Sequence, residues 1–258
     1  MAVQHFSHDG FDLAFLDQPP SAAGSGEPVL MIHGFASSHY VNWVSPGWFK
    51  TLSEAGYRAI ALDNRGHGLS SKSYEEADYT PPKMASDAVA LLDHLGIERA
   101  HVMGYSMGAR VSAFLALEAP ERVATLVFGG LGIGMVDGVG DWDPIADALL
   151  AEDPESITHR RGKSFRAFAD QTRSDRRALA ACIATSRELL TEDDMSRITQ
   201  PTLVAVGTTD DIGGSAAELA ALMPNAQSFD IEGRDHMLAV GDRTFKKRVL
   251  EFYAEHPL

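Results

Sequence analysis

The chain has very little cysteine and no long apolar run, and each absence excludes a class of protein. Among its 258 residues there is one cysteine, Cys182, which cannot form an internal disulfide and therefore fits a reducing compartment. No window approaches the roughly 18 consecutive apolar residues of a membrane-spanning helix. The first 30 residues include two histidines and three aspartates, where a secretory signal would be apolar. We therefore predict a cytoplasmic protein.

Positive charge is also scarce. The chain has 22 Lys and Arg against 36 Asp and Glu, which gives a formal net charge of −14. Such a chain repels phosphate backbones and anionic lipid headgroups, so we predict neither a nucleic-acid partner nor a membrane partner. Hydrophobic residues make up 45% and charged residues 22%, as is typical of a globular protein with a large core. Since α/β sheets reach about 250 residues as one unit, we expect one domain that carries an insertion.

Short apolar runs of strand length alternate with segments of helical period along most of the chain. This alternation predicts an α/β fold, with a mostly parallel sheet and crossover helices on both of its faces. The predicted strands are Phe11 to Leu16, Val29 to Ile32, Arg58 to Leu62, His101 to Gly104, Val123 to Phe128, Thr202 to Val206 and Ser228 to Ile231.

One long segment departs from this alternation. Residues 134–199 have helical periodicity and no convincing strand. We therefore expect a core domain made of residues 1–133 and 200–258, interrupted by a helical insertion of residues 134–199. A last helix is expected from about Arg243 to Tyr253.

The pattern Gly104-Tyr105-Ser106-Met107-Gly108 lies between a predicted strand and a predicted helix. A hydroxyl is a poor nucleophile, so it must project from a strained turn where a base can reach it, and flanking glycines remove side chains that would collide there. The bare pattern is a weak signal, and its strand-before, helix-after context supplies most of the weight. Ser106 is therefore the candidate nucleophile, the alternative being a serine in an ordinary glycine-rich turn.

An acidic pair, Asp210 and Asp211, lies just past the predicted strand Thr202 to Val206. In open parallel sheets the carboxyl ends of the strands form the edge where sites are built, so an aspartate there can reach a histidine from a neighbouring loop. We choose Asp210, and Asp137, after the preceding strand, is a lesser candidate. Taken alone, an aspartate in this place is more often a turn or helix-cap residue.

His236 is the candidate base, and chain order selects it among ten histidines. It is the only histidine in a loop downstream of the candidate acid, since His256 lies in the C-terminal tail. We expect His67 to be structural and to brace its own loop. His5 and His8 are too sparse for a metal site, and no group of residues has zinc-ligand spacing, so no metal is predicted.

The segment His33-Gly34-Phe35 follows the predicted strand Val29 to Ile32. Acyl chemistry at a carbonyl places negative charge on an oxygen, and backbone N–H groups aimed at that point stabilise it. Gly34 allows the sharp turn that such a loop needs. The candidate donors are the N–H of Phe35 and the N–H of Met107, which follows the candidate nucleophile and opens a helix.

Together, His33-Gly34, Asp63 to Ser70, the glycine-flanked serine, Asp210 and His236 resemble the α/β-hydrolase fold superfamily of serine hydrolases. The order Ser, Asp, His is similar to the order in that family. The resemblance covers the chain except the insertion, whose place is similar to that of the family's cap. It implies a sheet of about eight strands, with a helical cap inserted after the sixth strand and lying over Ser106.

The resemblance also implies a two-step acyl transfer that needs no cofactor. Ser106 would attack a carbonyl, His236, balanced by Asp210, would take and return the proton, and the amides of Phe35 and Met107 would hold the oxyanion. Water would then hydrolyse the acyl-enzyme. Because position 106 is Ser and not Asp, the haloalkane dehalogenase and epoxide hydrolase branches, which need a carboxylate nucleophile, are disfavoured.

Three functions follow as expectations. The first is a hydrolase of carboxylic esters with small or medium acyl groups, extending to lactones, which acts on a small-molecule substrate. The second is a cofactor-independent C–C bond hydrolase of dienoate or β-diketone compounds. The third is a non-catalytic ligand-binding member of the same fold, since fold does not guarantee function. The oligomeric state cannot be predicted from the sequence.

Substrate specificity has the weakest signal in the sequence. We predict that Trp43, Met135, Trp142 and Met237 line an apolar pocket, although each of these side chains fits an ordinary core position as well. Eight Lys and Arg lie between His159 and Arg187, in a chain that is otherwise acidic. They either attract carboxylate-bearing substrates or form a solvated helix face.

Overall fold

The computed structural model describes residues 1–258 and contains one sheet of eight strands, in the order β1-β2-β4-β3-β5-β6-β7-β8. Strand β2 is antiparallel to its neighbours β1 and β4, and all other pairs are parallel. The predicted fold class is confirmed. The strands are β1 (Gln4–His8), β2 (Phe11–Gln18), β3 (Pro28–Ile32), β4 (Arg58–Leu62), β5 (Ala100–Tyr105), β6 (Val123–Gly129), β7 (Thr202–Gly207) and β8 (Ala226–Ile231).

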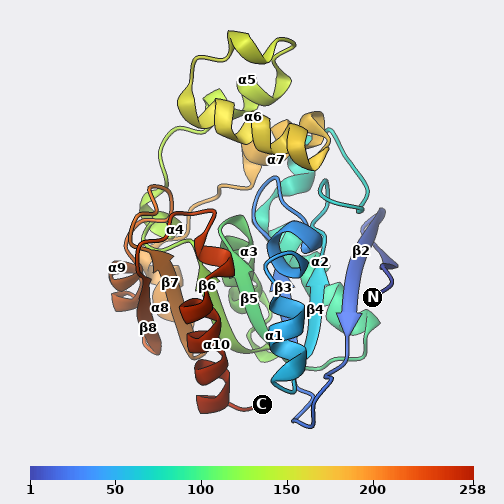
Figure 1. Ribbon diagram of the computed structural model, residues 1–258, viewed down its shortest axis with the longest axis vertical. Coiled ribbons are helices and arrows are strands. Elements are labelled where there is room, and N and C mark those ends of the chain that lie inside the picture. Colours follow the sequence, from blue (N-terminus) through green and yellow to red (C-terminus); the bar gives the residue numbers. More distant parts are fainter.

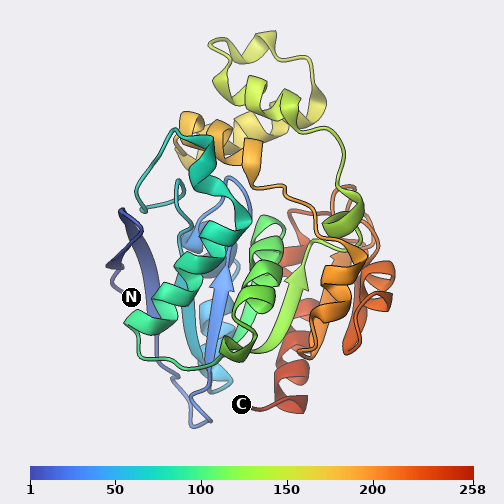
Figure 2. The same ribbon diagram turned by 180° about the vertical axis from the view of Figure 1, so that it is seen from behind.

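Helices cover both faces of this sheet (Figures 1 and 2). On one face lie α1 (Trp48–Glu54) and α10 (Arg243–Glu255), and on the other lie α2 (Pro81–His94), α3 (Met107–Glu118) and α9 (Ala216–Ala221). The central strands are apolar on both sides because both sides are covered. In β3, for example, Leu30 and Ile32 belong to one core cluster, whereas Val29 and Met31 belong to the other.

Between β6 and β7 the chain forms α4 (Gly134–Asp137), α5 (Asp143–Leu150), α6 (Arg160–Thr172), α7 (Arg176–Thr185) and α8 (Glu192–Arg197). Helices α5, α6 and α7, which we call the cap, stand over the carboxyl ends of the parallel strands (Figure 1). Helix α8 instead lies beside the sheet, near β7 and β8 (Figure 1). Only the middle of the expected insertion therefore stands over the sheet.

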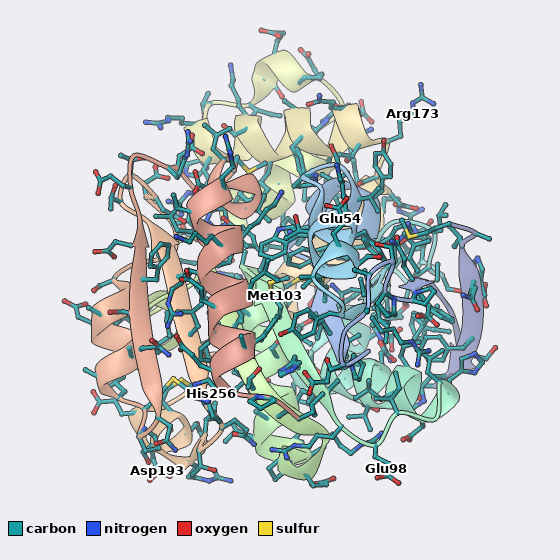
Figure 3. The ribbon with its side chains drawn as sticks, turned by 60° about the horizontal axis from the view of Figure 1, so that its bottom comes forward. Glu54, Glu98, Met103, Arg173, Asp193 and His256 are labelled. Carbon is teal, nitrogen blue, oxygen red and sulfur yellow. The ribbon has the colours of Figure 1, made fainter.

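Below the cap, apolar side chains pack against both faces of the sheet. Figure 3 shows Met103 of β5 at the middle of the molecule, surrounded by side chains, whereas Arg173, at the end of α6, extends into solvent. Short 3-10 turns, at Glu76–Tyr79, Pro120–Arg122, Pro154–Ser156 and Ala239–Gly241, and a π-helical turn at Tyr40–Val44 complete the chain. No helix combines the length and the apolar character that a membrane crossing requires.

The turn between β5 and α3 packs directly against the end of β3. A Cβ atom added at Gly108 would lie 2.0 Å from the carbonyl oxygen of Ile32, and one added at Gly104 would lie 2.1 Å from the carbonyl oxygen of Gly108. Both neighbours are backbone atoms, which cannot move aside as a side chain would. Both glycines of the motif are therefore required by packing.

We expect Gly108→Ala to destabilise the fold by about 3 kcal/mol, because the new methyl group collides with the β3 backbone. Gly96→Ala is the control, since nothing lies within 4 Å of its added Cβ and only its φ of +65° is strained. That variant should cost about 1 kcal/mol. Urea unfolding measures both, and equal losses in the two variants would contradict the packing argument.

Candidate active site

Ser106 occupies a strained turn between β5 and α3. Its φ of 54° and ψ of −115° lie outside the usual regions for a residue with a side chain. Such a conformation costs on the order of 1–3 kcal/mol and persists only where the surroundings enforce it. Here the flanking glycine contacts enforce it, as does the hydrogen bond from the Ser106 N–H to the Gly129 carbonyl, at 2.8 Å. The hydroxyl consequently projects from the carboxyl edge of the sheet.

The structure brings Ser106, His236 and Asp210 together from three separate loops. The Nε2 atom of His236 lies 3.0 Å from Oγ of Ser106, and its Nδ1 atom lies 2.8 Å from Oδ2 of Asp210. Of the other two candidate acids, Asp211 turns toward Arg160, 4.0 Å away, and Asp137 is exposed in α4. The geometry therefore singles out the same aspartate that the sequence favoured.

The Asp210 carboxylate is held in its charged form. Burial by itself would raise the pKa of this carboxyl, but the hydrogen bond and charge of His236 lower it, and the net pKa lies below the ordinary value. Its second oxygen accepts hydrogen bonds from the N–H groups of Ile212, at 2.8 Å, and Gly213, at 3.0 Å. With both oxygens bonded, the carboxylate has one orientation toward the imidazole.

In the loop after β3, hydrogen bonds hold both the N–H and the carbonyl of Gly34. The Gly34 N–H donates to Oδ1 of Asn42 at 3.1 Å, and the Nδ1–H of His33 donates to the Gly34 carbonyl at 2.7 Å. The His33 tautomer is set because its Nε2 accepts the Asn64 N–H at 3.0 Å. The peptide bond between Gly34 and Phe35 is trans. The Phe35 N–H therefore points in the opposite direction from the Gly34 carbonyl.

Two backbone N–H groups near Ser106 lack an internal partner. The N–H of Phe35 donates to no atom of the protein. Met107 is the first residue of α3, where an N–H has no acceptor within its own helix. The loop lies against the serine, since a Cβ at Gly34 would be 3.4 Å from Cβ of Ser106. The two donors predicted from the sequence are thus adjacent to the candidate nucleophile and free to bind.

A cluster of buried polar side chains lies next to this loop and stabilises it. His33 and His67 are fully buried, and burial lowers the pKa of His33 to about 4 and that of His67 to about 3. The Nδ1–H of His67 donates to the Arg65 carbonyl at 3.0 Å, in agreement with the predicted bracing role. Asp63 accepts the N–H groups of His39, at 2.6 Å, and Leu69, at 2.8 Å. Both imidazoles are therefore neutral near pH 7.

A cavity of about 1030 Å³ lies between the core and the cap, with Ser106 and His236 in its lining. Its charged lining is mixed, because Arg160 and Arg161 of the cap line it together with Asp141, Asp211 and Asp235. The larger apolar side chains that line it are Phe35, Val41, Trp142, Phe165, Phe168, Ile212, Met237 and Val240.

Two of the four side chains predicted to line the pocket do not reach it. Trp142 and Met237 do line the cavity. Trp43 is fully buried on the α1 face, edge to face with Trp48 at 6.1 Å, and Met135 is fully buried in the main core. The prediction is corrected for Trp43 and Met135, because apolar character alone does not distinguish a core position from a cavity wall.

Sequence reasoning did not select several residues that form the site. Phe165 and Phe168 have the i, i+3 spacing of one helix face, and this spacing could have identified them as cavity residues. Asn42 carries no pattern that marks its bond to Gly34. No group of three or more His, Cys, Asp or Glu side chains is arranged to hold a metal ion.

Comparison with known proteins agrees with this geometry. The α/β-hydrolase fold family matches residues 27–158, just over half of the chain. The chain belongs to this family. A solved structure of a hydrolase from Pseudomonas aeruginosa PA01 aligns with a TM-score of 0.76 and 26% identity over 97% of both chains. An esterase from Exiguobacterium antarcticum has a TM-score of 0.76 at 21% identity, and the alignment covers 95% of this chain and 97% of that one.

The curated relatives match only part of their own length. Epoxide hydrolase B of Mycobacterium tuberculosis is 37% identical over 125 residues, which are 46% of this chain and 34% of that protein. The chain thus spans about a third of the length of this relative. The α/β-hydrolase family membership rests on the family match, and the choice of reaction depends on the residues at the site.

The buried histidines predict a loss of stability in acid. Unfolded histidines titrate near pH 6.5, whereas His33 and His67 have lowered pKa values in the fold. Their contribution is complete above about pH 6.5 and is lost as the pH falls through the folded values. We expect each to remove about 3 kcal/mol of unfolding free energy between pH 7 and 4.

Urea unfolding at several pH values measures this effect. His67→Leu should flatten the acid dependence by about 3 kcal/mol. His5→Leu is the matched control, because the His5 side chain lies at the surface and the variant keeps both buried histidines, so the loss of stability that they cause in acid should persist. An identical acid dependence in wild type and His67→Leu would contradict the argument.

Proposed function

We propose that this chain is a serine hydrolase that cleaves carboxylic esters. The observation that carries the proposal is the line of contacts from Asp210 through His236 to Ser106, at 2.8 and 3.0 Å, which ends on a hydroxyl held at a positive φ. A hydroxyl next to an oriented imidazole is the arrangement that acyl transfer requires. Membership of the α/β-hydrolase fold family supports a hydrolase.

In the first step, Oγ of Ser106 attacks the ester carbonyl carbon while Nε2 of His236 takes the hydroxyl proton. The carbonyl oxygen becomes an oxyanion, which accepts hydrogen bonds from the N–H groups of Phe35 and Met107. Asp210 balances the charge on the imidazolium and keeps its ring oriented. When the C–O bond breaks, the leaving alkoxide receives the proton from His236 and departs as an alcohol.

In the second step, water attacks the acyl group on Ser106. His236 takes one proton from this water, and the same two N–H groups hold the second oxyanion. The intermediate then collapses, the proton returns to Oγ of Ser106, and the carboxylic acid leaves. These side chains and backbone groups supply every proton transfer and hydrogen bond that the proposed reaction needs.

The cavity supports esters of medium size. At about 1030 Å³ it matches the upper range of small-molecule pockets. Its apolar lining, including Trp142, Phe165 and Phe168, suits an acyl chain or an apolar alcohol group. The esterase from Exiguobacterium antarcticum, which aligns over 95% of this chain, supports an enzyme of this kind.

The relative named Epoxide hydrolase B raises the question of epoxide substrates, and the identity of residue 106 argues against them. A carboxylate that opens an epoxide forms an ester, which water can cleave at its carbonyl. Ser106 would instead form an ether with the epoxide carbon. An ether has no carbonyl for water to attack, so the enzyme would be blocked after one event.

Ser106→Ala should lower kcat on p-nitrophenyl butyrate by a factor of roughly 10⁴ to 10⁶, because no nucleophile remains. Ser112→Ala is the matched control. Ser112 is buried in α3 and its hydroxyl donates only within that helix, to the Gly108 carbonyl at 2.7 Å, so this variant should keep its activity. A Ser106→Ala enzyme with most of its activity would refute the proposal.

The ester series acetate, butyrate and octanoate tests the substrate class. We expect butyrate or octanoate to give the highest kcat/KM, because the cavity has room for a longer apolar chain. No turnover of any ester, together with cleavage of a dienoate or β-diketone, would replace ester hydrolysis with C–C hydrolysis.

The pH dependence of kcat/KM should have a single acid limb. Asp210 has a lowered pKa and stays ionised, so its carboxylate adds no limb to the profile on the acid side. A protonated imidazole cannot accept the Ser106 proton, and the rate should then fall about tenfold per pH unit. A profile that is flat between about pH 5 and 8 would exclude a histidine base.

A further inference from the structure

The residue before the proposed nucleophile makes a direct contact with the proposed base. The hydroxyl of Tyr105 donates a hydrogen bond to the backbone carbonyl of His236 at 2.6 Å. The two rings also pack together, with 5.6 Å between their centroids. This bond joins the end of β5 to the loop that follows β8, and no step of the proposed reaction uses it.

The position of the Tyr105 ring is fixed by packing. A Cβ added at Gly129 or at Gly130 would lie 2.7 Å from atoms of this ring, so these two glycines at the end of β6 make room for it. Burial raises the pKa of the Tyr105 phenol, and the nearby carboxylates of Asp210 and Asp235 raise it further. The hydroxyl therefore remains a donor. The ring packs against the two glycines and also borders the cavity.

The loop that bears His236 is mostly exposed. In the stretch 232–238, His236 is the only buried residue, and its neighbours on both sides are exposed. The imidazole is held at Nδ1 by Asp210, and the backbone before it is held at the Arg234 carbonyl by the Thr209 N–H, at 3.1 Å. The Tyr105 hydroxyl supplies a contact at His236 itself.

We propose that Tyr105 is a positioning residue that sets the distance between His236 and Ser106. This inference rests on the proposed function. Ser106 and His236 are joined twice, by the Nε2 to Oγ contact and by the path through the adjacent Tyr105 and its hydroxyl. If the second link is lost, the loop moves relative to the nucleophile, and proton transfer slows while substrate binding is kept.

Tyr105→Phe removes only the hydroxyl and tests this role. The matched control is Tyr79→Phe, because Tyr79 is also buried and its hydroxyl also donates to a backbone carbonyl, that of Ser73, at 2.6 Å. The Ser73 carbonyl belongs to no part of the proposed site. Both variants lose a bond that a hydroxyl donates to a backbone carbonyl, and Tyr79→Phe also loses the bond that its hydroxyl accepts from the Ser73 N–H at 3.0 Å. A general loss of stability therefore affects the control at least as much.

We expect Tyr105→Phe to lower kcat about tenfold with KM changed less than about twofold, because a small misplacement of a catalytic group has a large effect on rate. The rate at which an organophosphate modifies Ser106 should fall by about the same factor, since that reaction also needs the base. Tyr79→Phe should change neither rate by more than about twofold. Thermal melting compares the folded state of the two variants.

Equal kcat values in the two variants would overturn the positioning role. So would a loss of kcat/KM in Tyr105→Phe that comes from KM alone. A wild-type protein in which Ser106 does not react with the organophosphate would instead overturn the proposed function. If Tyr105→Phe does not fold, Gly129→Ala provides a second test, since its methyl group displaces the ring and leaves the hydroxyl present. That variant should also lose kcat at constant KM, and an unchanged kcat would overturn the inference.

Discussion

The close approach of the β5 to α3 turn to the end of β3 is the constraint on which the proposed site depends. Gly108 sits where any side chain would collide with the Ile32 carbonyl, and this contact keeps the turn tight. The tight turn in turn holds Ser106 at a positive φ with its hydroxyl clear of the sheet. A looser turn would allow the serine to relax into ordinary helical geometry and withdraw the hydroxyl.

The same contact places the other groups. Because β3 and β5 are neighbours and parallel, the loop after β3 lies directly against Ser106, and its free Phe35 N–H is close to the serine. The imidazole of His33 donates a hydrogen bond to that loop, and burial keeps this imidazole neutral. Asp210 and His236 lie in the loops after β7 and β8, at the same edge of the sheet. The cap then encloses a largely apolar cavity over them.

Much of this architecture could be predicted from local patterns. Seven of the eight strands follow from short apolar runs, and Ser106, Asp210 and His236 follow from their places after strands. Strand β1 was missed because it is an edge strand in which only Phe6 is buried, so its sequence has no apolar run. Helices α1 and α9 were missed because seven and six residues are too short for a clear helical period.

The locations of individual side chains were harder to predict than the helices and strands. Trp43 and Trp142 are equally apolar in the sequence, yet one packs against Trp48 in the core and the other lines the cavity. Hydrophobicity predicts that a side chain leaves water, but not which apolar space receives it. The bond from Tyr105 to His236 joins residues that are 131 positions apart and has no sequence pattern.

The central claim is that acyl transfer proceeds through Ser106, and detection of the acyl-enzyme tests it most directly. Wild-type protein is mixed with p-nitrophenyl butyrate, quenched in acid within milliseconds and digested for mass spectrometry, while the release of p-nitrophenol is followed in parallel. The account predicts one butyryl group per chain, located on Ser106. Turnover of the ester with no butyryl group on Ser106, or with the group on another residue, would contradict it.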